Sequence, residues 1–303
     1  MAQGAGRILM SGASGLIGSA VARSAPEKGL EVQTLVRRHR EVRQGRIYWN
    51  PSESNLGVHP AALEGFDAVI HLNGANVARR WTREYRETIV SSRVRTTEVL
   101  CEVLRKVRRK PRVLLCASAV GIYGDRGGEV LTEESSLGTG FLAETCQAWE
   151  AAAKRAWEMG IRVVHLRFGV VLSRKGGALG KVLPVFRLGM GGKLGSGQQW
   201  MSWISERDAV RAIWFLMEHE TLADAFNIMA PEPVRNAEFT QALARAVHRP
   251  ALLPVPRGVL RVAFGEMADQ TLLASQRGVP QKLEAAGFHF EDKKIGAALR
   301  TLL

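Results

Sequence analysis

The first 170 residues alternate short apolar segments with longer amphipathic ones. Short apolar runs bounded by turn residues are typical of strands buried in a sheet, and apolar residues at steps of three and four are typical of helices that cover one. The expected strands are residues 8–10, 32–36, 68–72, 113–117 and 163–168, and the expected helices are residues 16–28, 82–107 and 141–159. Strands separated by helices run parallel and are joined by right-handed crossovers. This order predicts an α/β fold with an open, doubly wound parallel sheet.

A glycine-rich turn follows the first expected strand. Gly12 permits the tight turn, Gly15 lets a pyrophosphate approach the backbone, and Gly18 lets the next helix pack closely on the strand. The helix that begins here offers free backbone N–H groups and the positive end of its dipole to phosphates. Because the pattern lies inside a strand-helix-strand unit, it predicts a dinucleotide site. The expected contacts are Ser11, Gly12, Ser14, Gly15, Leu16, Ile17 and Gly18.

Two arginines, Arg37 and Arg38, follow the second expected strand. A site that prefers NAD places an acidic residue there to accept a hydrogen bond from the ribose 2′-hydroxyl. That acidic residue is missing, and a guanidinium group suits a 2′-phosphate by charge and by geometry. The sequence therefore predicts NADP(H) rather than NAD, although a single arginine here would also fit an ordinary solvated surface.

The pattern changes beyond residue 172, where glycine-rich connections join shorter elements. We expect a discontinuous nucleotide-binding domain and a smaller C-terminal α+β lobe that holds the substrate. The expected boundaries are 1–175 and 198–230 for the domain, and 176–197 and 231–303 for the lobe. Because ligands of open parallel sheets bind at the carboxyl ends of the strands, we expect a small-molecule substrate in the cleft between the two parts.

Composition argues against several classes of function. The chain has 303 residues and a formal charge of +13. Its cysteines, Cys101, Cys116 and Cys146, are far apart, so neither a disulfide framework nor a cysteine metal site is indicated. The histidines show no metal-binding spacing either, and we predict no metal. No signal peptide or membrane span is recognised, so we expect a cytoplasmic protein with no membrane partner.

Much of the positive charge lies in two clusters, residues 37–43 and 105–112. Clustered basic residues are also a mark of nucleic-acid binding. Here the first cluster suits a cofactor phosphate, and the second complements the carboxyl end of an expected helix. Neither carries the interleaved aromatic residues of a single-strand binder. We expect no nucleic-acid partner, and the oligomeric state stays open.

The expected helix over residues 141–158 has two different faces. Phe141, Leu142 and Cys146 belong to its apolar stripe, whereas Glu150 and Lys154 belong to the polar face. Glu150 precedes Lys154 by four residues, a spacing that supports a helix on its exposed side. Taken alone, the stripe is typical of a packing element.

These features, with several further motifs, resemble the extended short-chain dehydrogenase/reductase superfamily, and within it an epimerase-like subfamily with an appended C-terminal domain. The motifs are residues 71–75, 80–81, 92–93, 96–97, 118–124, 145–150, 166–169, 195–199, 203–204, 208, 230–236 and 281–288. The resemblance covers nearly the whole chain. It implies a Rossmann-like core that binds NADP(H), with a substrate lobe at the C-terminal end. Beyond the glycine turn, it implies cofactor contacts from Arg37, Arg38, Asn73, Gly74, Ala75 and Ser118. Arg167 is a further candidate cofactor contact, although it would equally fit the surface or a structural ion pair.

Catalytic members of that superfamily use a Tyr-x-x-x-Lys pair on the helix after the fifth core strand. The lysine lowers the pKa of the tyrosine, and the phenol moves the proton that accompanies hydride transfer. No tyrosine of this chain has a lysine four residues later. By resemblance, Leu142 and Cys146 occupy the two positions and Ala119 the usual catalytic serine. Met201 stands where nucleotide-sugar epimerases often place an arginine for the substrate diphosphate, which argues against a sugar nucleotide.

Few residues remain to replace the missing groups. Ser118 and Tyr123, with or without a water molecule, are the candidate catalytic residues. The candidate substrate contacts are Trp81, Arg93, Tyr123 and Trp203, each of which also fits a purely structural role. Two hypotheses follow. The first is an NADP(H)-dependent, epimerase-like oxidoreductase with an unknown small substrate. The alternative is a catalytically silent NADP(H)-binding sensor or interaction protein.

Overall fold

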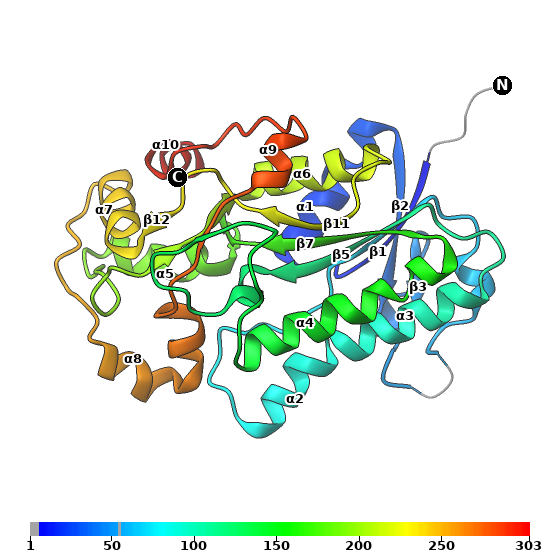
Figure 1. The fold of residues 1–303 in the computed structure, drawn as a ribbon, viewed down its shortest axis with the longest axis horizontal. Helices are drawn as coiled ribbons and strands as arrows, with labels where there is room; N and C mark the ends of the chain where they lie inside the picture. The colour runs from blue at the N-terminus through cyan, green and yellow to red at the C-terminus, as the bar shows by residue number, and fades with distance from the viewer. Residues whose placement is uncertain (1–5, 54–55) are drawn as a thin grey trace.

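A central sheet of seven strands organises the computed structural model, which describes residues 6–53 and 56–303 (Figure 1). Residues 1–5, which fall in the expected first domain, and residues 54–55 lie outside the described part. Neighbouring strands pair in parallel throughout. In spatial order the strands are β11 (Asp224–Ile228), β7 (Arg162–Phe168), β5 (Val113–Ala119), β4 (Ala68–His71), β1 (Gly6–Ser11), β2 (Leu30–Val36) and β3 (Arg46–Tyr48).

The strand order reverses at β1. The chain moves outward from β1 to β2 and β3, then crosses to β4 on the other side of β1. Ligands of open α/β sheets bind outside the carboxyl ends of the strands at such a reversal. Ser11 and His71, the last residues of β1 and β4, are paired in register, so the reversal lies at the glycine turn. The expected Rossmann-like, doubly wound fold is confirmed.

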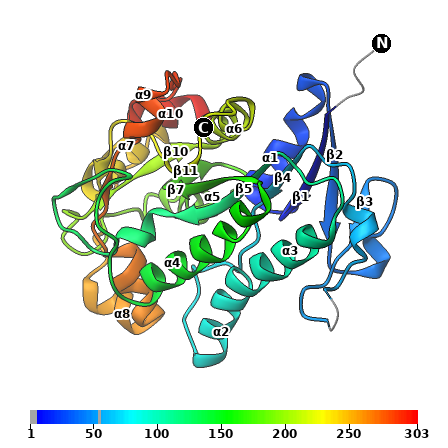
Figure 2. The ribbon, with the colours of Figure 1, turned by 45° about the vertical axis from the view of Figure 1, so that its right-hand side comes forward.

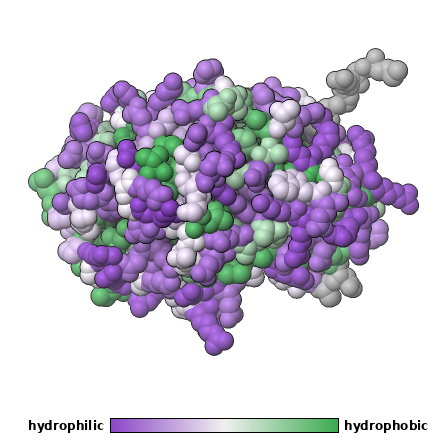
Figure 3. All heavy atoms as spheres, viewed as in Figure 1, coloured by the Kyte–Doolittle hydropathy of each residue, from purple (hydrophilic) through white to green (hydrophobic). Residues whose placement is uncertain are grey.

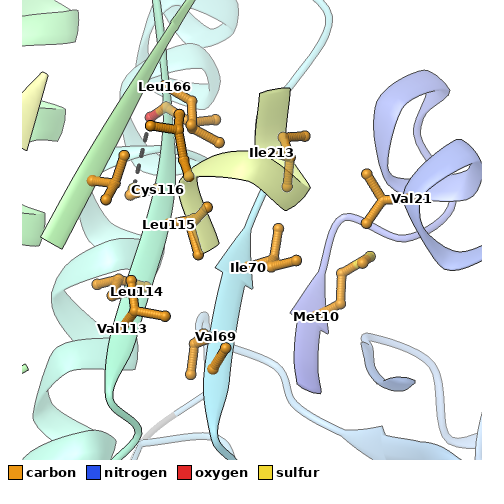
Figure 4. Packing of buried hydrophobic residues seen from close by; sticks show 14 of the residues in the cluster. Met10, Val21, Val69, Ile70, Val113, Leu114, Leu115, Cys116, Leu166 and Ile213 are labelled. Carbon is orange, nitrogen blue, oxygen red and sulfur yellow. Dashed lines mark hydrogen bonds between the residues drawn. The ribbon is translucent and has the colours of Figure 1, made fainter. Parts of the chain in front are cut away.

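Helices cover both faces of the sheet (Figure 2). On one face lie α1 (Leu16–Ser24) and α6 (Glu206–Glu218), and on the other lie α3 (Val94–Lys106) and α4 (Phe141–Lys154). Figure 4 shows Val21 of α1 and Ile213 of α6 over Met10 and Ile70 of the strands, and all four side chains are fully buried. Because both faces are covered, the central strands are apolar along nearly their whole length instead of alternating.

Two of the expected helices end earlier than their sequence pattern suggests. The segment 16–28 is α1 followed by a short turn of 3-10 helix over Pro26–Lys28, and the segment 141–159 is α4 followed by another over Trp157–Met159. In both, a glycine with positive φ ends the turn: Gly29 at 67° and Gly160 at 76°. Glycine adopts this left-handed conformation without steric cost, so it stops the helix.

The segment 82–107 was expected as one helix and is two. It forms α2 (Arg83–Ser91) and α3, with a break at Ser92 and Arg93. Thr82 caps α2 by accepting a hydrogen bond from the backbone N–H of Tyr85 at 3.2 Å.

The C-terminal part of the chain has its own hydrophobic cluster, which includes Leu179, Leu183, Phe239, Leu243 and Leu299. Its helices are α5 (Gly177–Arg187), α7 (Asn236–Ala246), α8 (Arg257–Phe264), α9 (Gln281–Ala285) and α10 (Ile295–Leu302), with a π-helical turn over Ala268–Leu272. The short strands outside the central sheet are β6 (Val130–Leu131), β8 (Val170–Ser173), β9 (Trp200–Met201), β10 (Trp203–Ser205), β12 (Val234–Arg235) and β13 (Arg277–Gly278). They pair two by two, β10 with β8, β12 with β9 and β13 with β6. The smaller α+β part expected from the sequence is present, and its exact boundaries stay a prediction.

Candidate functional site

The glycine turn between β1 and α1 has the backbone that its sequence predicts. Gly12 has a φ of 74°, and a Cβ atom there would lie 2.6 Å from the carbonyl oxygen of Leu72. A Cβ atom at Gly18 would lie 2.3 Å from the carbonyl oxygen of Gly12. Any larger residue would overlap the backbone at both positions, so the turn can close this tightly only with glycine.

The N-terminus of α1 is open to a ligand. Gly15 is its N-cap residue, no side chain caps it, and its first turn carries no acidic residue. Ser14 and Gly15 are exposed, and Leu16 and Ile17 are half-buried. Uncapped N–H groups and the helix dipole together favour an anion at this point.

Beneath the turn, a buried contact joins β1 and β4. The Ser11 Oγ and His71 Nδ1 atoms are 2.7 Å apart, and both side chains are buried. Burial lowers the pKa of His71 to about 3, so its ring is neutral near pH 7. The hydroxyl of Ser11, an expected cofactor contact, is therefore engaged with His71.

The segment after β4 is held by the break between α2 and α3. The Ser92 hydroxyl accepts a hydrogen bond from the backbone N–H of Ala75 at 2.9 Å. The Arg93 guanidinium donates to the carbonyl oxygens of Ala75 at 3.0 Å and Ile89 at 3.1 Å. A Cβ atom at Gly74 would lie 3.1 Å from that guanidinium. Arg93, an expected substrate contact, therefore shapes the loop that contains Asn73, Gly74 and Ala75.

Arg37 and Arg38 lie directly after β2, and both are exposed. In residues 6–53 and 56–303, neither guanidinium group has a hydrogen-bond partner or an ion-pair partner. Just beyond them, the rings of His39 and Tyr48 stack with centroids 3.7 Å apart, which fixes the following segment against β3. The two cations are thus presented at the carboxyl edge of the sheet without neutralisation.

A buried polar network lies behind the carboxyl ends of β5 and β7. The Glu150 carboxylate accepts hydrogen bonds from the Ser118 hydroxyl at 2.7 Å and from Nε and Nη2 of Arg167 at 2.9 Å each. Arg167 Nη1 donates to the Tyr123 oxygen at 2.9 Å, and the Tyr123 hydroxyl donates to Asn227 Oδ1 at 2.8 Å. All five side chains are buried. The network therefore satisfies its own donors and acceptors.

The charges of this network stabilise one another. Burial alone would raise the pKa of Glu150, but the hydrogen bonds and charge of Arg167 hold that pKa below its ordinary value. Burial would lower the pKa of Arg167, but the Glu150 carboxylate raises it. Burial raises the pKa of Tyr123 despite the nearby Arg167 cation. The phenol therefore stays protonated near pH 7.

The family model of the NAD-dependent epimerase/dehydratase family matches residues 8–228, and a domain of unknown function, DUF1731, matches residues 255–302. The chain belongs to the NAD-dependent epimerase/dehydratase family. It is 44% identical over 293 residues to the epimerase family protein Mb2239 of Mycobacterium bovis, covering 96% of each chain. It is 35% identical over 296 residues to the epimerase family protein SAR0825 of Staphylococcus aureus, covering 97% of this chain and 98% of that one.

The fold of this epimerase-family chain also matches a solved structure along its whole length. The crystal structure of the human epimerase family protein SDR39U1 with NADPH superposes with a TM-score of 0.88 and 30% identity, covering 98% of each chain. The resemblance to the epimerase-like subfamily inferred from the sequence is thereby confirmed.

Two candidate substrate contacts, Trp203 and Trp81, pack against other parts of the protein. Trp203 is fully buried in the C-terminal cluster, and its Nε1 donates to the carbonyl oxygen of Glu232 at 2.9 Å. A substrate cannot reach its ring in this conformation, so the expectation of a substrate contact does not fit. Trp81 is half-buried, with its Nε1 bonded to the carbonyl oxygen of Val77 at 2.9 Å and its ring edge-on to Phe141 at 5.1 Å.

The stripe of α4 faces the segment that follows β5. A Cβ atom at Gly121 would lie 3.8 Å from the Leu142 Cβ atom. Leu142 is half-buried, whereas Cys146 is buried, and burial raises the pKa of its thiol to about 12. The backbone N–H of Leu142 donates to the side chain of Gln270 at 3.0 Å. Apolar groups from α4 therefore line this side of the site.

Several residues of the site were missed or misplaced by sequence reasoning. Glu150 was placed on the polar, exposed face of its helix, but it is buried because it pairs with Arg167 across from α4. Asn227 and Gln270 were not singled out. A buried arginine within an apolar strand, Arg167, was the available signal that a carboxylate must lie opposite. In the described residues, no group of acidic, cysteine or histidine side chains is placed to hold a metal ion.

Proposed function

We propose that this epimerase-family chain binds NADP(H) across the carboxyl ends of β1, β2 and β4. The glycine turn supports this because Cβ atoms at Gly12 and Gly18 would fill the space that its tight backbone needs. The uncapped start of α1 suits the pyrophosphate, and the loop held by Ser92 and Arg93 borders the same edge.

The preference for NADP(H) over NAD rests on one observation: Arg37 and Arg38 after β2 are exposed, and their guanidinium groups have no partner among the described residues. In our proposal they bind the 2′-phosphate, whose double negative charge suits a forked, permanent cation. The NADPH in the crystal structure of human SDR39U1 supports the same choice.

For the reaction, we propose an epimerase-like oxidoreductase that acts on a small molecule bound at the carboxyl ends of the strands, on the side of the C-terminal part. The bound nicotinamide supplies the hydride chemistry. Ser118, Tyr123 and Arg167 then act as positioning residues, because their polar atoms bond to one another and to Glu150 and Asn227. A proton, where one is needed, comes from water or from the substrate itself. In the proposed site, Trp81 and Phe141 form an apolar wall.

A silent NADP(H)-binding protein is the second candidate. It is favoured by Leu142, an apolar residue that packs against the Gly121 segment where a proton-transferring side chain is expected by resemblance. Calorimetric titration with NADPH and NADH tests binding, and a panel of carbonyl compounds and alcohols tests turnover. Tight NADPH binding with oxidation of at least one substrate supports the enzyme. Tight binding without turnover across the panel supports the silent protein, and no binding contradicts both.

A further inference from the structure

One end of the molecule concentrates exposed aliphatic side chains. Of the eleven large apolar residues that the described part of the chain exposes, seven come from α5 and the loop after it, from the segment before α8, or from α8 itself. They are Val185, Leu188, Met190, Leu252, Leu253, Val259 and Val262. Leu188, Leu252 and Val262 are 71%, 79% and 78% exposed, so most of each residue lies outside the packing of the fold. We call these seven residues the α5–α8 surface.

The two segments that carry most of the α5–α8 surface run side by side. The backbone N–H of Leu253 donates to the carbonyl oxygen of Gly191 at 3.2 Å. The backbone N–H of Val255 donates to the carbonyl oxygen of Lys193 at 2.9 Å. Arg249 Nε donates to the carbonyl oxygen of Arg187 at 3.2 Å. Helix α8 begins two residues after Val255 and presents Val259 and Val262 on one face. Figure 1 places α5, α7 and α8 at the same end, and Figure 3 shows apolar groups among polar ones there.

The same segments carry a one-sided charge. Residues 174–205 contain five lysines and arginines, residues 239–265 contain four, and neither segment contains an aspartate or a glutamate. The basic residues around the surface are Arg187, Lys193, Arg245, Arg249, Arg257 and Arg261. Among the described residues, Asp269 is the acidic side chain that pairs with these cations, with Arg257 at 3.4 Å and with Arg261 at 3.0 Å. The surface is therefore aliphatic and cationic, so its partner must be apolar and anionic.

Two other partners fit less well. A second copy of the chain joined by a two-fold axis would bring this cationic surface against itself, and like charges would oppose the contact. A single-stranded nucleic acid would require exposed aromatic rings for base stacking, whereas the seven exposed side chains are aliphatic. Aliphatic side chains that enter a headgroup layer, ringed by cations that attract anionic lipids, are the usual features of a peripheral membrane surface.

We propose that the α5–α8 surface binds the surface of an anionic lipid bilayer. The attachment is peripheral, because no helix of the described residues has the length and hydropathy to cross a bilayer. It departs from the expectation of no membrane partner, which rested on the lack of a spanning segment. It is also independent of the nucleotide site, since none of its residues belongs to the proposed cofactor contacts.

Sedimentation of the full chain with vesicles tests this proposal. Vesicles of phosphatidylcholine containing about one third phosphatidylglycerol are compared with pure phosphatidylcholine, at low and at high salt. We expect binding only to the anionic vesicles, weaker at high salt. The double variant Leu252→Ser/Leu253→Ser should reduce that binding at least tenfold, and Arg187→Gln/Lys193→Gln should reduce it several-fold.

Matched controls test whether binding depends on this surface or only on the number of exposed apolar and basic side chains. Val42→Ser/Val130→Ser removes two other exposed apolar side chains, which are 47% and 46% exposed, and Lys106→Gln/Arg108→Gln removes two other exposed cations. Both controls should bind as the unchanged chain does. Equal binding to neutral vesicles, an equal loss of binding in the controls, or no binding to the anionic vesicles would overturn the proposal. A dimer or a complex with single-stranded DNA formed through this surface would identify the other partner. Thermal unfolding of every variant confirms that the fold is intact.

Discussion

Arg167 and Glu150 form a two-point ion pair in the interior of the molecule, with Nε and Nη2 each 2.9 Å from a carboxylate oxygen. The exposed fractions of the two side chains are 7% and 9%. The pair joins β7 to α4, and it orders Ser118 and Tyr123 through further hydrogen bonds. It therefore links the sheet to the helix that lines the site.

Removing one member of this pair should be costly. Arg167→Met leaves the Glu150 carboxylate buried without its counter-ion, and we expect the free energy of unfolding to fall by about 3–5 kcal/mol. Combining it with Glu150→Leu removes the second charge, so the double variant should recover part of the loss. Denaturation by urea measures both. Losses below about 1 kcal/mol for the single variant, or strict additivity, would contradict the assigned coupling.

Tyr123→Phe should affect stability more than function. The change removes a hydroxyl that accepts from Arg167 and donates to Asn227, and we expect a loss of about 1–3 kcal/mol in the free energy of unfolding. The affinity for NADPH should stay within about two-fold, because the phenol is fully buried. If a substrate is found, a kcat that falls by orders of magnitude with unchanged stability would instead make Tyr123 a catalytic residue.

Stability should decline in mild acid because of His71. Its pKa is lowered to about 3 in the folded protein, from 6.5, so between these values the unfolded chain binds the extra proton. The free energy of unfolding should therefore fall as pH drops below 6.5, by up to about 1.4 kcal/mol per pH unit for this group. Buried His165, whose pKa burial also lowers, adds to the same trend.

The variant His71→Gln should flatten this slope between pH 6.5 and pH 5, as measured by urea denaturation at each pH. An identical slope in the unchanged chain and in the His71 variant would show that this histidine does not govern the acid response.

Gly18→Ala tests how closely α1 packs on the turn. An added Cβ atom would lie 2.3 Å from the carbonyl oxygen of Gly12, so the turn must open. We expect unfolding to become easier by about 1–3 kcal/mol, and NADPH to bind at least tenfold more weakly. Gly258→Ala in α8 meets nothing within 4 Å and should stabilise the chain by about 0.5–1 kcal/mol. Equal effects at the two positions would refute the close-packing argument.

The local signals in the sequence predict the core of this fold well. The apolar strands and the turn at Gly12 are encoded by neighbouring residues, so their periodicity and glycine spacing were sufficient. The comparison with known proteins confirms the fold and the family that these signals and the further motifs predicted. Two strands of the sheet, β3 and β11, were not predicted. The three half-buried residues of β3 carry too little pattern.

The helix break and the buried charges of the site depend on contacts between residues far apart in the chain, which sequence spacing does not reveal. The helix over 82–107 breaks because Ser92 and Arg93 reach Ala75, which is 17 and 18 residues away in the chain. Glu150 has the spacing of a surface residue, yet its partner Arg167 lies on β7 and draws it into the interior. Helical periodicity predicts which face a residue occupies, but the partner decides whether a charge on that face is buried.

The central claim is that Arg37 and Arg38 make this chain an NADP(H)-binding protein. Calorimetric dissociation constants for NADPH and NADH, measured with the unchanged chain and with Arg37→Ala/Arg38→Ala, test it most directly. The matched control is Arg108→Ala/Arg109→Ala. These two exposed, adjacent arginines precede β5 and lie near the amino ends of the strands, away from the carboxyl ends. We predict that the unchanged chain and the control prefer NADPH by at least about tenfold, or 1.4 kcal/mol, and that the Arg37/Arg38 variant loses that preference while its NADH affinity is kept. Equal affinities for the two cofactors in the unchanged chain, or an unchanged NADPH affinity in the variant, would contradict the claim.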